Sequence, residues 1–143
     1  VLCACDGFNY ITYDDDLQNV FDTTYELLKD DGIFIFDISS YYKLANILGG
    51  NIYGENREDV SYLWQNYFDD EENLLEMELA FFIKGEDERY DKFEEVHQQR
   101  AYTEEEIIGM LQESGFGNIK VYGDFTFNKP NEESERIFFV CKK

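Results

Sequence analysis

The 143-residue sequence is poor in basic residues, has one proline and one histidine, and contains no long hydrophobic run. Twelve lysines and arginines stand against 32 aspartates and glutamates, which gives a formal net charge of -20 at pH 7. Because an acidic surface repels phosphate groups, this balance disfavours binding to nucleic acid or to an anionic membrane. The sequence shows no membrane-spanning segment and no signal peptide. These absences leave a small molecule as the expected partner.

Cysteine is also scarce, and no two cysteines form a CxxC pair. Cys3 and Cys5 lie two residues apart in a predicted strand and therefore on one face of it, while Cys141 lies in another predicted strand. Unpaired cysteines behave as small buried hydrophobic residues in a reducing compartment. We therefore predict free thiols and a cytoplasmic location.

The residues that are present are sufficient for one folded domain. Hydrophobic residues make up 43% of the chain and aromatic residues 17%, which argues against disorder despite the charge. The length suits one core, and no repeat or Gly/Ser/Pro-rich linker divides the sequence. A single domain over residues 1–143 is expected.

The first forty residues follow a strand–helix–strand pattern. Two apolar runs, residues 1–5 and 33–38, flank a helical segment that opens with Asp14 to Asp16 and stops before Gly32. The helix presents one apolar stripe, formed by Leu17, Val20, Phe21, Leu27 and Leu28. Two fully apolar strands joined by a helix are typical of a parallel sheet that is covered on both faces.

Three consecutive aspartates, Asp14 to Asp16, begin this helix. Carboxylates are favoured at a helix N-terminus, where free amides and the helix dipole attract them. The alternative, a metal site, would need a special loop to converge them on one ion. We expect no metal.

Asp6 and Asp37 occupy equivalent places, each at or just past the end of a predicted parallel strand. In open α/β sheets, ligands bind outside the carboxyl ends of the strands. This edge is therefore the expected site.

The second half changes character. A short helix ends at Gly49 and Gly50, and the region from about 60 to 101 then alternates polar and apolar residues, with turns at 69–73 and 85–88. This pattern predicts an inserted three-stranded antiparallel meander. A helix follows with Thr103 and Glu106 as a capping box and Gly115 at its end, and two final strands form a hairpin at the sheet edge.

Several stretches, in this order, resemble the C-terminal portion of class I S-adenosylmethionine-dependent methyltransferases. "CACDGFNYI" is similar to the end of that family's fourth strand, where an acid and an Asn-Tyr pair line the crevice. "LLKDDGIFIFDI" is similar to the start of the fifth strand, and "HQQRAYTEEEIIGMLQESGF" to a later helix. The resemblance implies an α/β fold with a partial Rossmann-like methyltransferase sheet, parallel strands plus a C-terminal antiparallel hairpin, and an inserted β-meander.

One part of the family pattern has no counterpart. The family's acid followed by a GxGxG loop, which wraps the cofactor, does not occur, and the first three strands of the fold have no equivalent segments. The chain is therefore expected to be the latter part of a longer enzyme, with its first strand left at an open edge. Such an edge recruits another strand. We predict self-association, or pairing with a complementary N-terminal segment.

The resemblance and the residue types together suggest site residues. Cys5, Asp6 and Gly7 are the candidates for contact with S-adenosylmethionine. The candidates for substrate binding are Asn9, Tyr10, Asp37, Trp64, Arg100 and Tyr102, and those for catalysis are His97 and Tyr10.

Each candidate also has a structural alternative. Asp6 and Asn9 could cap the local turn, and Asp37 could cap the helix that follows it. His97, which could exchange a proton near neutral pH, could instead be a hydrogen-bonded structural residue. Trp64 could stack on a substrate or pack in the core.

Three functions remain open at this stage. The first is an S-adenosylmethionine-dependent methyltransferase that acts on a small molecule. The second is a non-catalytic module that uses its open sheet edge for oligomerisation or interaction. The third is a β-meander ligand carrier unrelated to methylation, which would lack parallel pairing of the first two strands.

Overall fold

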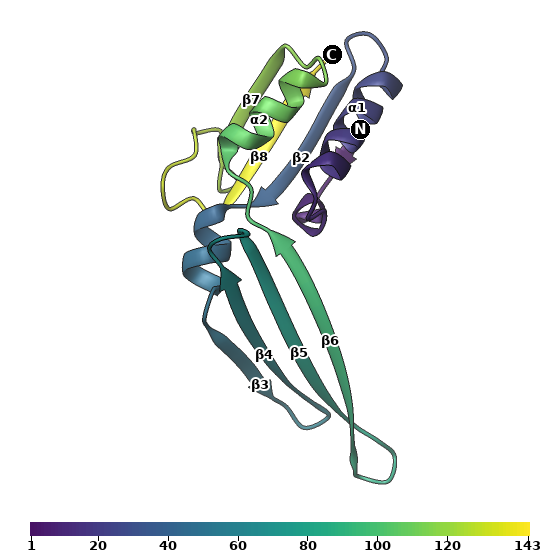
Figure 1. Ribbon diagram of the computed structural model, residues 1–143. Helices are drawn as coiled ribbons and strands as arrows, with labels where there is room; N and C mark the ends of the chain where they lie inside the picture. Colours follow the sequence, from purple (N-terminus) through teal and green to yellow (C-terminus); the bar gives the residue numbers. More distant parts are fainter.

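Two four-stranded sheets make up the computed structural model, which describes residues 1–143 (Figure 1). The first sheet has the order β1-β2-β8-β7, formed by Leu2–Cys3, Ile33–Ser39, Arg136–Lys142 and Asn118–Gly123. The second has the order β3-β4-β5-β6, formed by Ile52–Asn56, Val60–Asp69, Leu74–Lys84 and Tyr90–Arg100. We call the first sheet with its helices α1 (Asp14–Leu27) and α2 (Glu104–Glu113) the body, and the second sheet the cap.

Parallel pairing of β1 with β2 is confirmed, with Leu2 opposite Ile35 and Cys3 opposite Phe36. The strand is shorter than predicted and ends at Cys3. Cys5 and Asp6 adopt left-handed backbone conformations, with φ of 65° and 51°. Their amides donate to the Asp37 carboxylate instead of continuing the ladder, so the chain turns away from β2.

The closing hairpin is also confirmed. Antiparallel β8 lies between β2 and β7, with Phe36 opposite Phe139 and Phe138 opposite Tyr122. The last strand in the sequence therefore reaches the middle of the sheet, beside β2.

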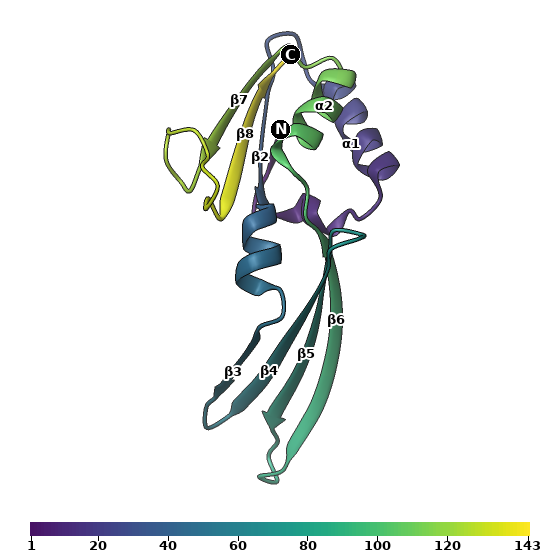
Figure 2. The ribbon, with the colours of Figure 1, turned by 60° about the vertical axis from the view of Figure 1, so that its left-hand side comes forward.

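The core of the body lies on one face of its sheet. Phe34, Phe36 and Ile38 point to that face, together with Phe139, and all four are buried. Phe36 stacks on Phe34 and on Phe139, each with ring centroids 4.8 Å apart. Both helices cover this face (Figure 2).

Coverage of both sheet faces, which the apolar pattern predicted, is not found. Ile33 on the other face is 49% exposed, because α1 and α2 lie on the same side. Leu27 also departs from its prediction, because it is 77% exposed at the last turn of α1, whereas Leu28 of the same predicted stripe is buried. The helix ends there, and Asp31, not Gly32, has the positive φ, at 64°.

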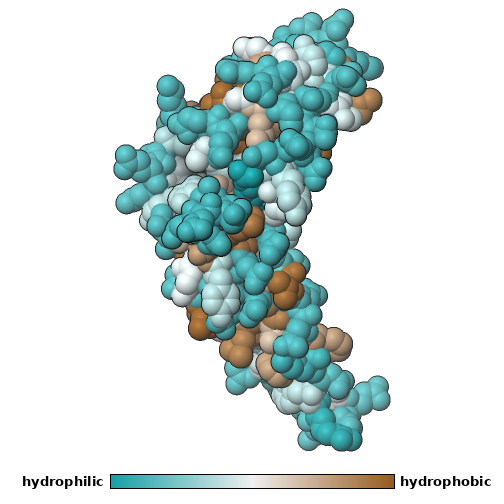
Figure 3. Space-filling view, viewed as in Figure 1, coloured by the Kyte–Doolittle hydropathy of each residue, from teal (hydrophilic) through white to brown (hydrophobic).

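The cap contains one strand more than the predicted meander. β3 pairs with β4 ahead of the three expected strands, from Ile52 opposite Gln65 to Asn56 opposite Ser61. The predicted turns are confirmed between β4 and β5 and between β5 and β6. The cap projects away from the body (Figure 1), and apolar side chains are exposed along it (Figure 3).

A short helical segment, η2 (Lys43–Leu48), connects body and cap. Leu44 from this segment packs with Leu75, Met77 and Ala101 in a small second core at the base of the cap. The first helical turn after β2 begins at Ser40, whose hydroxyl accepts a hydrogen bond from the Lys43 amide at 3.0 Å.

The start of α2 follows the sequence prediction. Thr103 and Glu106 form the capping box, with hydrogen bonds of 3.2 Å and 2.7 Å in the two directions. Gly115 has φ 107°, and a Cβ there would lie 2.9 Å from the Tyr25 ring. None of the helices is both long enough and apolar enough to span a lipid bilayer.

Candidate functional site

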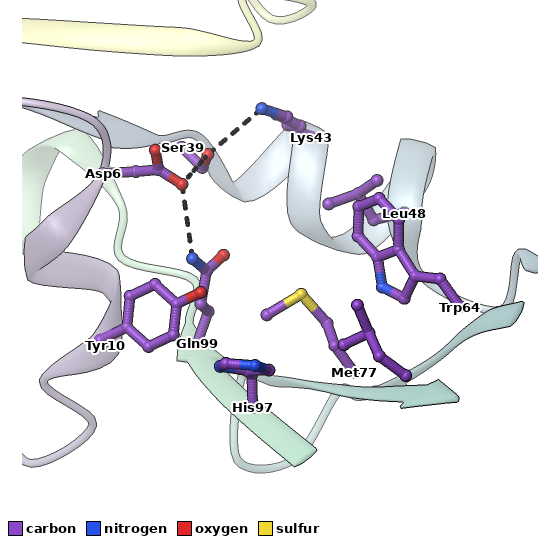
Figure 4. A pocket seen from close by; sticks show the side chains of 10 residues that line it. Asp6, Tyr10, Ser39, Lys43, Leu48, Trp64, Met77, His97 and Gln99 are labelled. Atoms are coloured by element: carbon purple, nitrogen blue, oxygen red, sulfur yellow. Dashed lines mark hydrogen bonds between the residues drawn. The ribbon is translucent and has the colours of Figure 1, made fainter. Parts of the chain in front are cut away.

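A cavity of about 270 Å³ lies where the cap meets the body (Figure 4). It adjoins the carboxyl ends of β1 and β2, the edge at which open α/β sheets bind ligands. Ten residues line it: Asp6, Tyr10, Ser39, Lys43, Leu48, Trp64, Met77, Leu79, His97 and Gln99. Four predicted site residues, Asp6, Tyr10, Trp64 and His97, are thereby brought together.

Asp6 connects three parts of the fold at the polar end of the cavity. One carboxylate oxygen accepts hydrogen bonds from Ser39 Oγ at 3.2 Å and from Gln99 Nε2 at 3.4 Å. The other accepts from Arg136 at 3.0 Å. Lys43 Nζ donates to the same Ser39 hydroxyl at 3.4 Å. The left-handed turn at Asp6 is what aims its side chain between cap and body.

Asp37 lies behind Asp6 and does not line the cavity. Its two oxygens accept the amides of Cys5 and Asp6 at 2.9 and 3.1 Å, and Arg136 bonds to one of them. Asp37 therefore caps the turn that carries Asp6, and Ser40 takes the helix-capping place. Burial would lower the pKa of Arg136, but its hydrogen bonds with Asp37 and Asp6 outweigh this effect and raise that pKa.

Asn9 is fully buried and holds the body against the cap. Its amide nitrogen donates to the carbonyls of Ser39 and Arg100, at 3.0 and 2.9 Å, and its oxygen accepts the Ser39 amide at 2.9 Å. Every one of these partners is backbone. Asn9 thus fixes the strand end of β2 to the last residue of β6.

Tyr10 and His97 face each other across the cavity mouth. Their rings meet edge to face, with centroids 5.9 Å apart. His97 Nε2 lies 3.1 Å from a Glu95 carboxylate oxygen, a contact that orients the imidazole from the solvent side. Tyr10 comes from the body and His97 from the cap, so any relative movement of the two parts changes this pair.

Trp64 lies at the opposite, apolar end of the cavity, near Leu48 and Met77 (Figure 4). The Tyr53 ring packs against it at a centroid distance of 5.2 Å. Its indole Nε1 is buried and has no hydrogen-bond partner.

Arg100 and Tyr102 are not among the residues that line this cavity. Arg100 forms ion pairs with Asp14 at 2.6 Å and Glu106 at 3.5 Å, and lies 4.9 Å from the centre of the Tyr102 ring. Tyr102 is fully buried and donates to the Ile11 carbonyl at 2.6 Å. Burial raises the pKa of Tyr102 to about 12, with Arg100 acting in the opposite direction.

The loop of Cys5, Asp6 and Gly7 follows β1 at the body edge. Cys5 is exposed, contrary to the predicted burial, because the chain turns after Cys3. A Cβ on Gly7 would lie 3.3 Å from Cys3 Sγ. Burial, with smaller contributions from Asp37 and Cys5, raises the pKa of Cys3. All three thiols are free, as predicted.

The sequence prediction missed several residues of the site. Gln99 had a usable signal, since it lies two residues from His97 on the same face of a strand. Ser39 is the last residue of β2, two residues after Asp37, and Lys43 begins η2. Arg136 had no local signal, because its partner Asp6 lies 130 residues away.

Comparison with known proteins identifies relatives of this arrangement. No protein-family model matches the chain. A protein of Geobacillus sp. (strain WCH70) named "Putative methyltransferase" is 39% identical over all 143 residues. The "Putative methyltransferase YqeM" of Bacillus subtilis (strain 168) is 35% identical over the same residues. The chain spans 58% of the length of each.

A crystal structure of an S-adenosylmethionine-dependent methyltransferase from Clostridium acetobutylicum is also similar. It is 38% identical and superposes with a TM-score of 0.88 over 99% of this chain and 56% of its own. The chain is thus similar in sequence and in fold to the C-terminal part of such methyltransferases. The partial methyltransferase sheet with an inserted antiparallel sheet, predicted from the sequence, is thereby confirmed.

Proposed function

We propose that this chain forms the acceptor-binding part of an S-adenosylmethionine-dependent methyltransferase that acts on a small molecule. The observation that carries the proposal is the cavity at the carboxyl ends of β1 and β2, which brings Asp6, Tyr10 and His97 together under the cap. Its volume of about 270 Å³ is close to the lower end of the range for small-molecule sites.

The residues present fit one side of a cofactor site. Cys5 is exposed beside Asp6. The left-handed turn places the backbone of residues 5–7 at the end of β1, with the Cys5 and Asp6 amides bonded to Asp37. Cys5, Asp6 and Gly7 would contact S-adenosylmethionine there. When bound, it supplies a methyl group on a positively charged sulfur. The Asp37–Arg136 pair would hold this loop in place.

The chain's own side chains would align the acceptor and accept its proton. His97 takes the proton from an amine or hydroxyl of the acceptor, and Tyr10 holds the imidazole edge. Trp64 lies against the acceptor at the apolar end. Asn9, Asp37, Arg100 and Tyr102 act by positioning the elements that carry these residues. The cap would exclude water from the reacting atoms.

Isothermal titration of this chain with S-adenosylmethionine tests the proposal. Micromolar binding that weakens at least tenfold in Asp6→Asn supports it. Saturating concentrations that release no heat would contradict a cofactor site on this chain. Glu58→Gln is a matched control, because it removes one carboxylate from the distant β3–β4 turn.

A second candidate function follows from the edge of the body sheet. β1 has a neighbour on one side only, and its Leu2 side chain is 72% exposed. We propose that this edge pairs with another strand, either from a second copy or from a complementary segment. Sedimentation velocity tests pairing with a second copy. A monodisperse monomer at high micromolar concentration contradicts this self-association. We also propose a cytoplasmic location, supported by the three free thiols.

A further inference from the structure

The cavity has two chemically different ends. Asp6, Ser39, Lys43 and Gln99 form the polar end, whereas Leu48, Met77 and Leu79 surround Trp64 at the other (Figure 4). Hydrogen bonds already link the four polar residues to one another. The apolar end has a single polar atom without a partner, the Nε1 of Trp64.

That indole nitrogen belongs to a residue of the cavity lining and is itself buried. It lies on the ring edge that faces Met77 (Figure 4). The Tyr53 ring packs against the indole, with centroids 5.2 Å apart. A buried N–H without an acceptor is costly, so a ligand that supplies an acceptor is favoured over one that does not. Sites with such a group discriminate strongly against analogues that lack the matching atom.

The charge around the cavity decides which kind of hydrogen-bond acceptor fits beside the Trp64 indole. Lys43 is the one cation of the lining, and it is bound to Ser39 beside Asp6, at the far end from Trp64. The chain as a whole carries a formal charge of -20. A carboxylate or phosphate beside Leu48, Met77 and Leu79 would be buried without a counter-charge. An uncharged oxygen carries no such penalty.

From these observations we infer that Trp64 selects the methyl acceptor, by donating its indole N–H to an uncharged oxygen on an otherwise apolar body. The methyl acceptor is therefore a small molecule with two ends, and its end at Trp64 is uncharged. A carbonyl, ether or hydroxyl oxygen lies at Trp64, and the nucleophilic hydroxyl or amine lies near His97 and Asp6. The nucleophilic end of the ligand rests on the proposed function. The uncharged oxygen at Trp64 does not.

A matched pair of fragments tests the inference on the full chain. 4-Hydroxyacetophenone and 4-ethylphenol share the ring and the phenolic hydroxyl, and differ in the ketone oxygen. Trp64 is the only tryptophan of the chain, so its indole ¹H–¹⁵N signal reports on this end of the cavity without ambiguity. We expect the ketone to bind at least fivefold more tightly and to shift the indole proton downfield.

Trp64→Phe keeps an aromatic ring and removes the N–H, so the preference for the ketone should fall below twofold. Tyr67→Phe is the control, because it removes one hydroxyl from the opposite face of the same strand and should keep the preference. Affinities in the variants can be followed by the ring signal of His97, the only histidine. The downfield shift in the unmodified chain provides an independent reading should Trp64→Phe fold poorly.

Equal affinities for the two fragments, a preference that survives in Trp64→Phe, or binding of neither fragment would each overturn the inference. Fragment binding needs neither S-adenosylmethionine nor methyl transfer. A negative titration with S-adenosylmethionine would therefore count against the proposed function and leave this result standing, and the converse also holds.

Discussion

The body and the cap are both four-stranded sheets, yet they are stabilised in different ways. The body buries a continuous core of fourteen residues between its sheet and two helices, with stacked phenylalanines at its centre. The second core, at the base of the cap, has four buried residues, of which only Leu75 and Met77 belong to the cap sheet. The rest of the cap is held by cross-strand pairs along its long strands.

This difference explains where the cavity lies. The body offers rigid strand ends, and the cap offers a face that is packed only near its base. Residues from both parts meet there through a few specific contacts, chiefly Asp6 with Gln99 and Tyr10 with His97. A binding site at such a junction can be formed by side chains from both parts without changing the packing inside either part. Four substitutions, in decreasing order of expected effect, test the comparison.

Phe36→Ala should have the largest effect, because Phe36 is stacked on two rings in the body core. We expect a loss of about 3–5 kcal/mol in the free energy of unfolding. Urea denaturation followed by circular dichroism measures it, with Phe36→Leu as a milder version. Phe93→Ala, in the cap and 54% exposed, should cost less than about 1 kcal/mol. Similar losses in the two parts would contradict the comparison.

Arg136→Met should have the next largest effect, because it leaves Asp6 and Asp37 without their cation. We expect a loss of about 2–3 kcal/mol, less than for fully buried pairs because Asp6 and Arg136 remain partly exposed. Amide hydrogen exchange at Cys5 and Asp6 should also accelerate. Arg57→Met, which breaks the exposed pair with Glu55, is the control and should leave the free energy of unfolding essentially unchanged. Unchanged exchange at residues 5 and 6 would refute the role of Arg136.

The pH dependence of stability provides a third test, through the buried thiol of Cys141. Burial raises its pKa from 9.0 to about 12. Below pH 9 the thiol is protonated in both states, and its contribution is fully present. Above pH 9 only the unfolded state ionises, so stability falls until the pH passes the folded pKa. The unmodified chain should therefore lose about 1.4 kcal/mol per pH unit more than Cys141→Ala between pH 9.5 and 10.5. Parallel curves in urea denaturation would exclude this linkage.

Thr103→Ala should have the smallest effect, because it removes one half of the capping box at the boundary between cap and body. The expected loss is about 1 kcal/mol, since the Glu106 amide would lose its acceptor. Thr23→Ala, at an exposed position inside α1, should cost nothing, because alanine is the better helix former. Thermal denaturation compares the two, and an equal loss in both would argue against the capping role.

Local patterns accounted for most of the secondary structure, apart from β3, and for part of the site. The apolar runs predicted β1 beside β2, the capping box predicted α2, and the position of Asp6 after a strand placed it in the cavity. Strand alternation would also have indicated Gln99. Coverage of both sheet faces was predicted wrongly, because an apolar run does not report how many helices are available to cover it.

The sequence by itself determined the elements, the order in which they occur and the acids that follow the parallel strands, because these depend on periodicity and on residues close in the chain. The tertiary structure alone decided that Arg136 joins Asp6 to Asp37, that Arg100 turns toward Asp14 and Glu106, and that Trp64 keeps an unpaired N–H. These contacts join residues far apart in the chain, or depend on packing between two sheets. No local pattern encodes them.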